Sequence, residues 1–139
     1  MNKAEYNRKT KETNIKIKVA YPTTGKIDIN TGIGFFDHML TLLAKHGGFD
    51  LEITAQGDLN IDAHHTVEDV GICLGKAFSS LFPNFETLNR FGHSVIPMDE
   101  ALAETAIDLS GRPHLEFEAD LPKVKLGNFD IELTEEFFK

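Results

Sequence analysis

Two adjacent histidines and a glutamate three residues further on, His64, His65 and Glu68, have side chains of the types that bind metal ions. The apolar residues that follow recur near helical spacing, which places the three residues at the start of a helix. On a helix, His64 and Glu68 share a face at i,i+4, whereas the His65 side chain is rotated by about 100° from that of His64. This spacing favours two metal ions, or one ion and a substrate contact, over one ion held by both histidines.

A polar helix N-terminus explains the same residue types without a metal. In that interpretation Thr66 or Asp62 caps the helix, and Glu68 and Asp69 interact favourably with the helix dipole. A single His-His-x-x-Glu motif also occurs by chance, so the motif alone does not decide between the two interpretations.

The composition is that of one soluble globular domain. The chain has 139 residues, of which 41% are hydrophobic and 26% charged, and it is long enough to bury a core. It has no apolar run that could span a bilayer and no secretory signal at its start, so we expect a cytoplasmic protein. A net charge of -8 without a stripe of Lys and Arg argues against nucleic acid as a partner. An anionic small molecule is compatible with this composition if a few cations lie near it.

Periodic patterns predict the elements that position the motif. Residues 13–20 alternate between apolar and polar, with Ile15, Ile17 and Val19 on one side, which is typical of a half-buried strand. We also expect short strands at 26–30 and 49–55, a helix at 36–45 closed by Gly47-Gly48, and a helix from the motif to about Phe82, where Pro83 ends it. The one cysteine, Cys73, falls among the apolar residues of this last helix and is predicted to be buried and inert.

The order of the elements begins again after residue 84. Residues 104–109 resemble residues 12–17, and Phe129-Asp130 resembles Phe36-Asp37. We interpret this as a tandem duplication of a strand, strand, helix, strand, helix unit in one compact α+β domain, with residues 1–84 as the first repeat and residues 85–139 as the second. A second His-His motif would fall beyond Lys139, so we expect the second repeat to be incomplete.

Four separated segments of the chain form a recognisable series. They are Gly32-Ile-Gly-Phe-Phe-Asp-His-Met-Leu40, Asp62-Ala-His-His-Thr-Val-Glu-Asp69, Pro97-Met-Asp-Glu100 and Asp108-Leu-Ser-Gly-Arg-Pro113. These segments, in this order, resemble the imidazoleglycerol-phosphate dehydratase family of histidine biosynthesis. The resemblance implies a duplicated fold of mixed sheets and helices, similar to domain 2 of ribosomal protein S5. It also implies two manganese ions per site and a homo-oligomer of twenty-four subunits built from trimers, with sites shared between subunits. Family members are longer, and their C-terminal part carries a second His-His-x-x-Glu and a further metal-binding histidine.

The reaction that the resemblance implies converts imidazole glycerol phosphate into imidazole acetol phosphate. A hydroxyl leaves the carbon attached to the imidazole and a proton leaves the next carbon, and neither group is acidic. An imidazolate held between two divalent metals can push out the hydroxyl, with the metals as Lewis acids and as a template. Imidazole and carboxylate ligands fit manganese, iron or zinc, and the resemblance selects manganese.

The resemblance assigns roles to eight residues by motif position. His38, His64, His65 and Glu68 correspond to metal ligands, Glu12 and Glu68 to catalytic carboxylates, and Arg90, Arg112 and Asp99 to substrate contacts, with the two arginines on the phosphate. Without the resemblance, Glu12 is a solvated strand residue and each arginine an exposed loop charge. The other histidines, His46, His93 and His114, are expected to be structural or exposed.

Two other classes of function fit the motif. One is a non-catalytic metal-binding fragment of the family, and the other is a different metal-dependent enzyme, a hydrolase that uses a metal-bound hydroxide. Four ligands cannot fill the shells of two ions, so further donors must come from the second repeat, another subunit or the substrate. For this reason we expect little or no dehydratase activity from the 139 residues alone.

Overall fold

A computed structural model describes residues 1–139 except the side chain of Phe85. The elements are β1 (Asn2–Lys9), β2 (Thr13–Tyr21), β3 (Ile27–Asn30), α1 (Gly34–Gly47), β4 (Asp50–Gly57), α2 (His64–Leu81), the 3-10 turn η1 (Phe85–Thr87), β5 (Phe91–Met98), β6 (Ala101–Asp108), β7 (Lys125–Leu126), β8 (Phe129–Asp130) and α3 (Leu133–Phe138). The contacts divide the chain into two compact units. The first unit comprises Met1–Leu81 and Leu115–Lys139, and the second unit comprises Phe82–His114.

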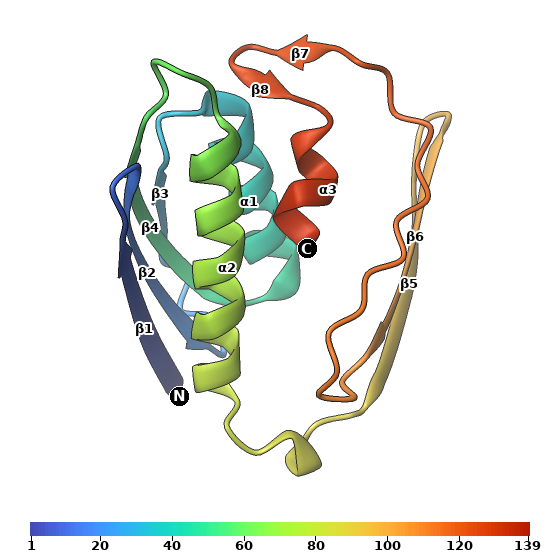
Figure 1. Cartoon of the computed structure of the whole chain (residues 1–139). Helices are drawn as coiled ribbons and strands as arrows, with labels where there is room; N and C mark the ends of the chain where they lie inside the picture. Colours follow the sequence, from blue (N-terminus) through green and yellow to red (C-terminus); the bar gives the residue numbers. More distant parts are fainter. The chain divides into compact units, whose positions relative to one another are not determined.

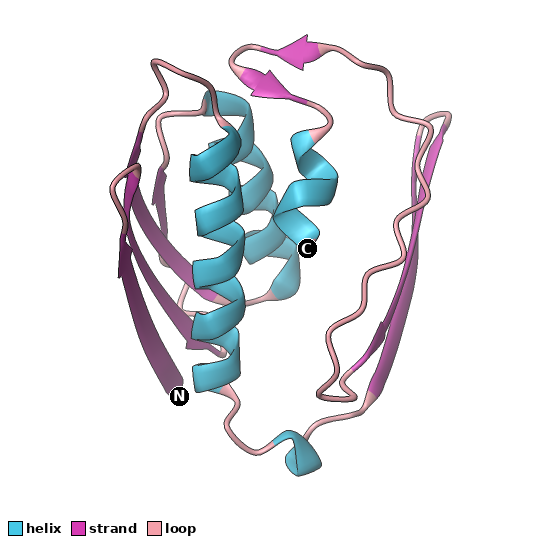
Figure 2. Cartoon of the chain, viewed as in Figure 1, coloured by secondary structure: helices cyan, strands magenta, loops and turns pink.

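The first unit is built on a four-stranded mixed sheet with the order β1-β2-β4-β3, which confirms the predicted α+β class. The pairs β1–β2 and β2–β4 are antiparallel, and β3 runs parallel to β4. The helices lie on one face of the sheet (Figures 1 and 2). On β2 the predicted alternation is confirmed, because Ile15, Ile17 and Val19 are buried toward the helices and the lysines between them are exposed.

Helix α1 ends where the sequence predicts it. Gly48 adopts the left-handed conformation, with φ of 69°, and its N–H donates to the carbonyl of Ala44. On the buried side of α1, the Phe36 ring lies 5.8 Å from the ring of Phe129 in β8 and 5.5 Å from the ring of Phe137 in α3. These aromatic contacts hold the C-terminal segment in the first unit.

Helix α2 begins at His64, as the motif predicts, and contacts β1, β2 and α3. Its buried face is formed by Val67, Val70, Cys73, Leu74, Ala77 and Leu81. Burial raises the pKa of the Cys73 thiol to about 11, so the thiol stays protonated and inert at neutral pH, as expected. Among the described residues, no helix is long and apolar enough to cross a membrane.

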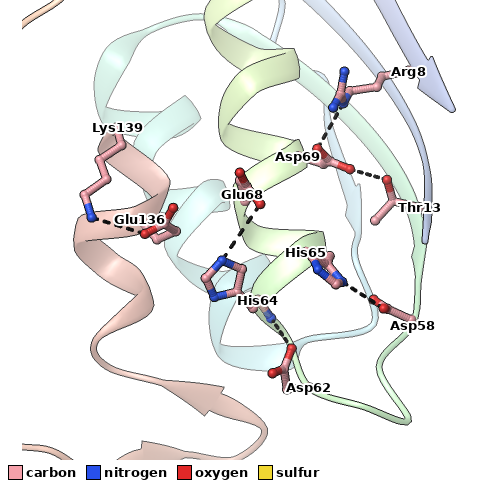
Figure 3. Close-up of polar contacts among 10 residues, drawn as sticks. All are labelled: Arg8, Thr13, Asp58, Asp62, His64, His65, Glu68, Asp69, Glu136 and Lys139. Atoms are coloured by element: carbon pink, nitrogen blue, oxygen red, sulfur yellow. Dashed lines mark hydrogen bonds and ion pairs between the residues drawn. The ribbon is translucent and has the colours of Figure 1, made fainter. Parts of the chain in front are cut away.

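A buried carboxylate ties α2 to two strands. The side chain of Asp69 is 8% exposed and accepts one hydrogen bond from Nε of Arg8 in β1 at 2.9 Å and another from the hydroxyl of Thr13 in β2 (Figure 3). A buried charge is tolerated only when it is paired and hydrogen-bonded, so the three residues act together. Because its two oxygens bind two different strands, Asp69 fixes the rotation of α2 over the sheet.

The second unit and β1 differ from the sequence-based expectation. Strand β1 was not predicted, because its polar residues show no regular apolar alternation. In the second unit, β5 and β6 pair antiparallel, and the side chains of both strands are exposed. The expected strand at 104–109 lies in the second half of β6. Whether residue 84 separates two repeats stays a prediction.

Two glycines of α2, Gly71 and Gly75, differ in the space beside them and can be compared as substitution sites. A Cβ on Gly71 would lie 2.6 Å from the carbonyl oxygen of Phe137, whereas a Cβ on Gly75 would meet nothing within 4 Å. Gly75→Ala should raise the free energy of unfolding by about 1 kcal/mol through helix propensity. Gly71→Ala should lower it by about 1–3 kcal/mol, because α3 must shift. Urea unfolding measures both, and equal stabilisation by the two variants would contradict this packing.

The Asp69 contacts predict a second effect on stability. Thr13→Val removes the hydroxyl and leaves a buried carboxylate oxygen with one donor fewer, so it should lower the free energy of unfolding by about 1–3 kcal/mol. Thr13→Ser keeps the hydroxyl and should lose less. If both variants lose the same amount in urea unfolding, the methyl group of Thr13 and not its hydrogen bond stabilises this region.

Candidate metal and substrate site

The site in the first unit lies where β4 leads into α2. A Cβ on Gly57, the last residue of β4, would lie 1.9 Å from Oγ1 of Thr66, so only glycine allows this close approach to the first turn of α2. In the connecting loop, Oδ1 of Asp62 accepts the backbone N–H of His64 at 2.9 Å and so caps the helix start. The chain that leads into the motif is therefore fixed at Gly57 and at the cap formed by Asp62.

His64 and Glu68 lie on one face of α2, as the helical spacing predicts. Nε2 of His64 is 3.8 Å from Oε2 of Glu68, and the two side chains are 45% and 41% exposed. His65 has a different partner, since its Nδ1 lies 2.8 Å from Oδ2 of Asp58 (Figure 3). The imidazole rings of His64 and His65 are 5.9 Å apart and inclined by 79°. The two imidazoles thus diverge, and each is paired with its own carboxylate.

The charges around His65 come from several segments of the chain. The hydrogen bond to Asp58 raises the pKa of His65, burial opposes this, and the charges of Asp58, Glu12 and Asp62 raise the pKa further. The predicted catalytic residue Glu12, at the β1–β2 turn, is therefore close enough to act electrostatically on a predicted metal ligand. A metal binds the neutral imidazole. Because the pKa of His65 is raised, a proton competes with a metal for the imidazole of His65 more strongly than it does for the imidazole of a free histidine.

His38 lies in the first turn of α1 and is exposed. Its neighbour Asp37 accepts hydrogen bonds from the backbone N–H and the hydroxyl of Thr31, which fixes the start of the helix. Among the described residues, no group of three or more His, Cys, Asp or Glu side chains is placed to hold a metal ion. The donor types at His64 and Glu68 fit manganese, and the two side chains lie 3.8 Å apart on one face of α2. A metal bound there would need further donors from outside this pair.

A hollow beside His64 contains acidic residues that the sequence analysis missed. It has a volume of about 290 Å³ and is lined by Asp62, His64, Asp130, Glu132, Leu133 and Glu136. Oε2 of Glu136 is also 3.3 Å from Nζ of Lys139. Four carboxylates next to an imidazole favour a cation over a phosphate on this side of α2. The i,i+4 spacing of Glu132 and Glu136 was the available signal, but an acidic pair on a helix is more often a solvated face.

The three predicted substrate contacts all lie in the second unit. Arg90 donates from Nε to Oδ1 of Asp108 at 2.7 Å and from Nη2 to Oδ2 at 3.2 Å, and its guanidinium lies 5.0 Å from the centre of the Phe91 ring. This pairing lowers the pKa of Asp108. Arg112 is exposed in a turn where its backbone N–H donates to the Ser110 hydroxyl, and Asp99 lies at the β5–β6 turn with φ of 50°.

Sequence comparisons connect this chain to enzymes of one family. A model of the family described as imidazoleglycerol-phosphate dehydratase matches residues 31–139. The imidazoleglycerol-phosphate dehydratase of Acetivibrio thermocellus is 56% identical over 137 residues, which cover 99% of this chain and 70% of the relative. That of Bacillus cytotoxicus is 55% identical over 139 residues, which cover 100% of this chain and 71% of the relative.

Two solved structures have the same fold. The crystal structure of imidazoleglycerol-phosphate dehydratase from Staphylococcus aureus matches with a TM-score of 0.85 and 42% identity, covering 98% of this chain and 74% of that one. The enzyme from Pyrococcus furiosus, in complex with (S)-C348, matches with a TM-score of 0.76 and 37% identity, covering 95% of this chain and 69% of that one. With the motifs around His38, His64 and Arg112 in the matched region, the chain belongs to the imidazoleglycerol-phosphate dehydratase family of hydro-lyases.

Proposed function

We propose that this protein dehydrates imidazole glycerol phosphate to imidazole acetol phosphate in the histidine biosynthesis of the cytoplasm. The observation that carries the proposal is the arrangement at the start of α2, where His64 and Glu68 lie 3.8 Å apart and His65 is paired with Asp58. The family to which the chain belongs and the names of its relatives support the same reaction.

The proposed metal ligands are His38, His64, His65 and Glu68, with two manganese ions in a complete site. When bound, such divalent ions would act as Lewis acids on the imidazole ring of the substrate and as a template for it. Glu12 is the proposed acid and base, because the reaction removes one carbon-bound proton and expels a hydroxyl that must leave as water. The charge of Glu12 contributes to the raised pKa of His65, which supports a place near this proposed ligand.

Arg90 and Arg112 are proposed to bind the substrate phosphate, and Asp99 to make a further polar contact. Two hydrogen bonds to Asp108 fix the orientation of the planar Arg90 guanidinium. Its paired N–H donors also suit two phosphate oxygens. A phosphate at Arg90 must share the guanidinium with Asp108 or displace this carboxylate. Arg112 is exposed, so a phosphate can reach its guanidinium.

Donor counting leads to a proposal about assembly. Manganese prefers about six donors, and two ions therefore need more ligands than His38, His64, His65 and Glu68 provide. We propose that the missing donors come from further residues or from a second copy of the chain in a homo-oligomer, which the family resemblance puts at twenty-four subunits. Little turnover is expected from a single copy of these 139 residues, because a metal with an incomplete shell is weakly held.

A duplication of the fold is proposed at the level of element order. The antiparallel hairpin β1–β2 starts at Asn2, and a second antiparallel hairpin, β5–β6, starts at Phe91. The similar segments fall at different places, since residues 12–17 begin β2 and residues 104–109 end β6. The order of the strands thus supports the duplication. The alignment of residues 12–17 with residues 104–109 does not, because the two segments lie at different places in their strands.

Ligand-dependent thermal stability separates the dehydratase from the two other classes. A ligand at about 100 times its Kd stabilises the native state by about 2.7 kcal/mol. With manganese present, a phosphate ester that carries an imidazole or triazole ring should raise the Tm, and glycerol phosphate should raise it less. An effect of manganese without any effect of the ring-bearing ligand would indicate a non-catalytic metal-binding protein. Equal effects of both phosphate esters would favour a hydrolase.

Replacement of the two motif histidines tests the metal ligands. His64→Ala and His65→Ala should each lower the amount of manganese that remains bound after desalting, because the two imidazoles diverge and cannot substitute for each other. His46→Ala, at the exposed C-terminal end of α1, is the matched control and should keep its manganese. Elemental analysis gives the metal content, and full retention by both motif variants would contradict the assignment.

Arg112→Ala tests the phosphate contact. A hydrogen bond to a charged group is worth about 1.5–3 kcal/mol, so this variant should bind the imidazole phosphate ligand about tenfold or more weakly. Its affinity for the same ligand without phosphate should change little, and the control Lys16→Ala, on the exposed side of β2, should change neither. Calorimetric titration measures these affinities. Equal losses for both ligands would assign Arg112 a purely structural role.

A further inference from the structure

Asp58 is a carboxylate in the first unit that the dehydratase motifs do not include. It directly follows β4, and its side chain is 15% exposed. Its Oδ2 lies 2.8 Å from Nδ1 of His65. Its Oδ1 is buried and has no hydrogen-bond partner among the described residues. A buried carboxylate oxygen without a donor costs free energy. The position of Asp58 therefore leaves one of its own oxygens without a hydrogen bond, while the other oxygen is the partner of His65.

The backbone fixes Asp58 beside α2. The contact of Gly57 with Oγ1 of Thr66 brings the end of β4 against the first turn of the helix, and Asp58 is the next residue. The N–H of Ile61 donates to the carbonyl of Asp58 at 2.8 Å, which closes the turn that follows. The carboxylate therefore meets His65 from a rigid segment and not through a flexible side chain.

This contact determines which nitrogen of His65 carries the proton. An ionised carboxylate only accepts hydrogen bonds, so Nδ1 of His65 must be the donor. In a neutral imidazole with its proton on Nδ1, the lone pair available to a ligand is on Nε2. His64 is not fixed in this way, because its Nε2 is 3.8 Å from Glu68, beyond hydrogen-bond distance.

We propose that Asp58 is a positioning residue that orients the His65 ring, keeps the proton of the neutral ring on Nδ1 and presents Nε2 as the binding nitrogen. The part of this proposal that concerns the bound group rests on the proposed function, in which His65 is a manganese ligand. The part that concerns the ring itself depends only on the contact between Asp58 and His65. Carboxylates that accept from the second nitrogen of a metal-binding histidine typically change metal affinity by about 10- to 100-fold.

Nitrogen-15 NMR of the metal-free chain, at a pH where the histidines are neutral, tests the ring. The His65 signals, assigned with His65→Gln, should show the Nδ1–H tautomer. In Asp58→Asn and Asp58→Ala the obligate acceptor is lost, and the Nε2–H tautomer that predominates in free histidine should gain population. Asp62→Asn is the matched control, because Asp62 lies in the same loop but accepts from the backbone of His64. A dominant Nε2–H tautomer in the unmodified chain, or no change in either Asp58 variant, would overturn the proposal.

Manganese titration, followed by the electron paramagnetic resonance signal of the free ion, tests the consequence. Asp58→Asn should lower the affinity by about 10- to 100-fold, whereas the control Asp28→Asn, at an exposed position of β3, should not. If the tautomer changes but the affinity does not, Asp58 does not position a ligand nitrogen and the proposal fails. If His65→Gln binds manganese as tightly as the unmodified chain, the ligand assignment in the proposed function fails, and the tautomer result still decides the role of Asp58 toward the ring.

Discussion

The hydrogen-bonded carboxylate of Asp69 is the contact on which the arrangement of the first unit depends. Apolar burial turns one face of α2 toward the sheet, and Asp69 adds directional hydrogen bonds from Arg8 in β1 and Thr13 in β2 that favour one orientation of the helix. The predicted catalytic carboxylates are the chain neighbours of two of the three residues in this contact, since Glu12 precedes Thr13 and Glu68 precedes Asp69. The buried interaction therefore links the segments that carry Glu12 and Glu68.

The elements that carry the motif could be predicted because their signals are local. The alternation of Ile15, Ile17 and Val19 and the helix start at His64 follow from residue spacing and are confirmed. Strand β1 was missed because an edge strand of polar residues obtains its structure from pairing with β2 and not from its own pattern. Asp58 and Asp69 were missed as positioning residues for a related reason. A single carboxylate forms no periodic pattern in the sequence. The hydrogen-bond partners of Asp58 and Asp69 come close to them only in the folded chain.

The two adjacent histidines have unequal environments. His65 is held by Asp58 and lies in the field of Glu12, whereas His64 faces Glu68 across a longer distance and borders an acidic hollow. A rigid nitrogen and an adjustable one suit a site in which one imidazole fixes the position of a bound ion and the other completes the shell. The family resemblance suggested the ligand types and the helical spacing predicted that the two imidazoles diverge, but only the structure shows their different carboxylate partners.

We infer that the start of α2, as oriented by Asp69, is the metal-binding part of the first unit. Anomalous diffraction at the manganese absorption edge, from crystals of this chain grown with manganese, locates the bound ions. We expect an anomalous peak within about 2.0–2.6 Å of the imidazole nitrogens or carboxylate oxygens of His64, His65 or Glu68. Anomalous peaks only at other residues, with these three side chains unliganded, would contradict it.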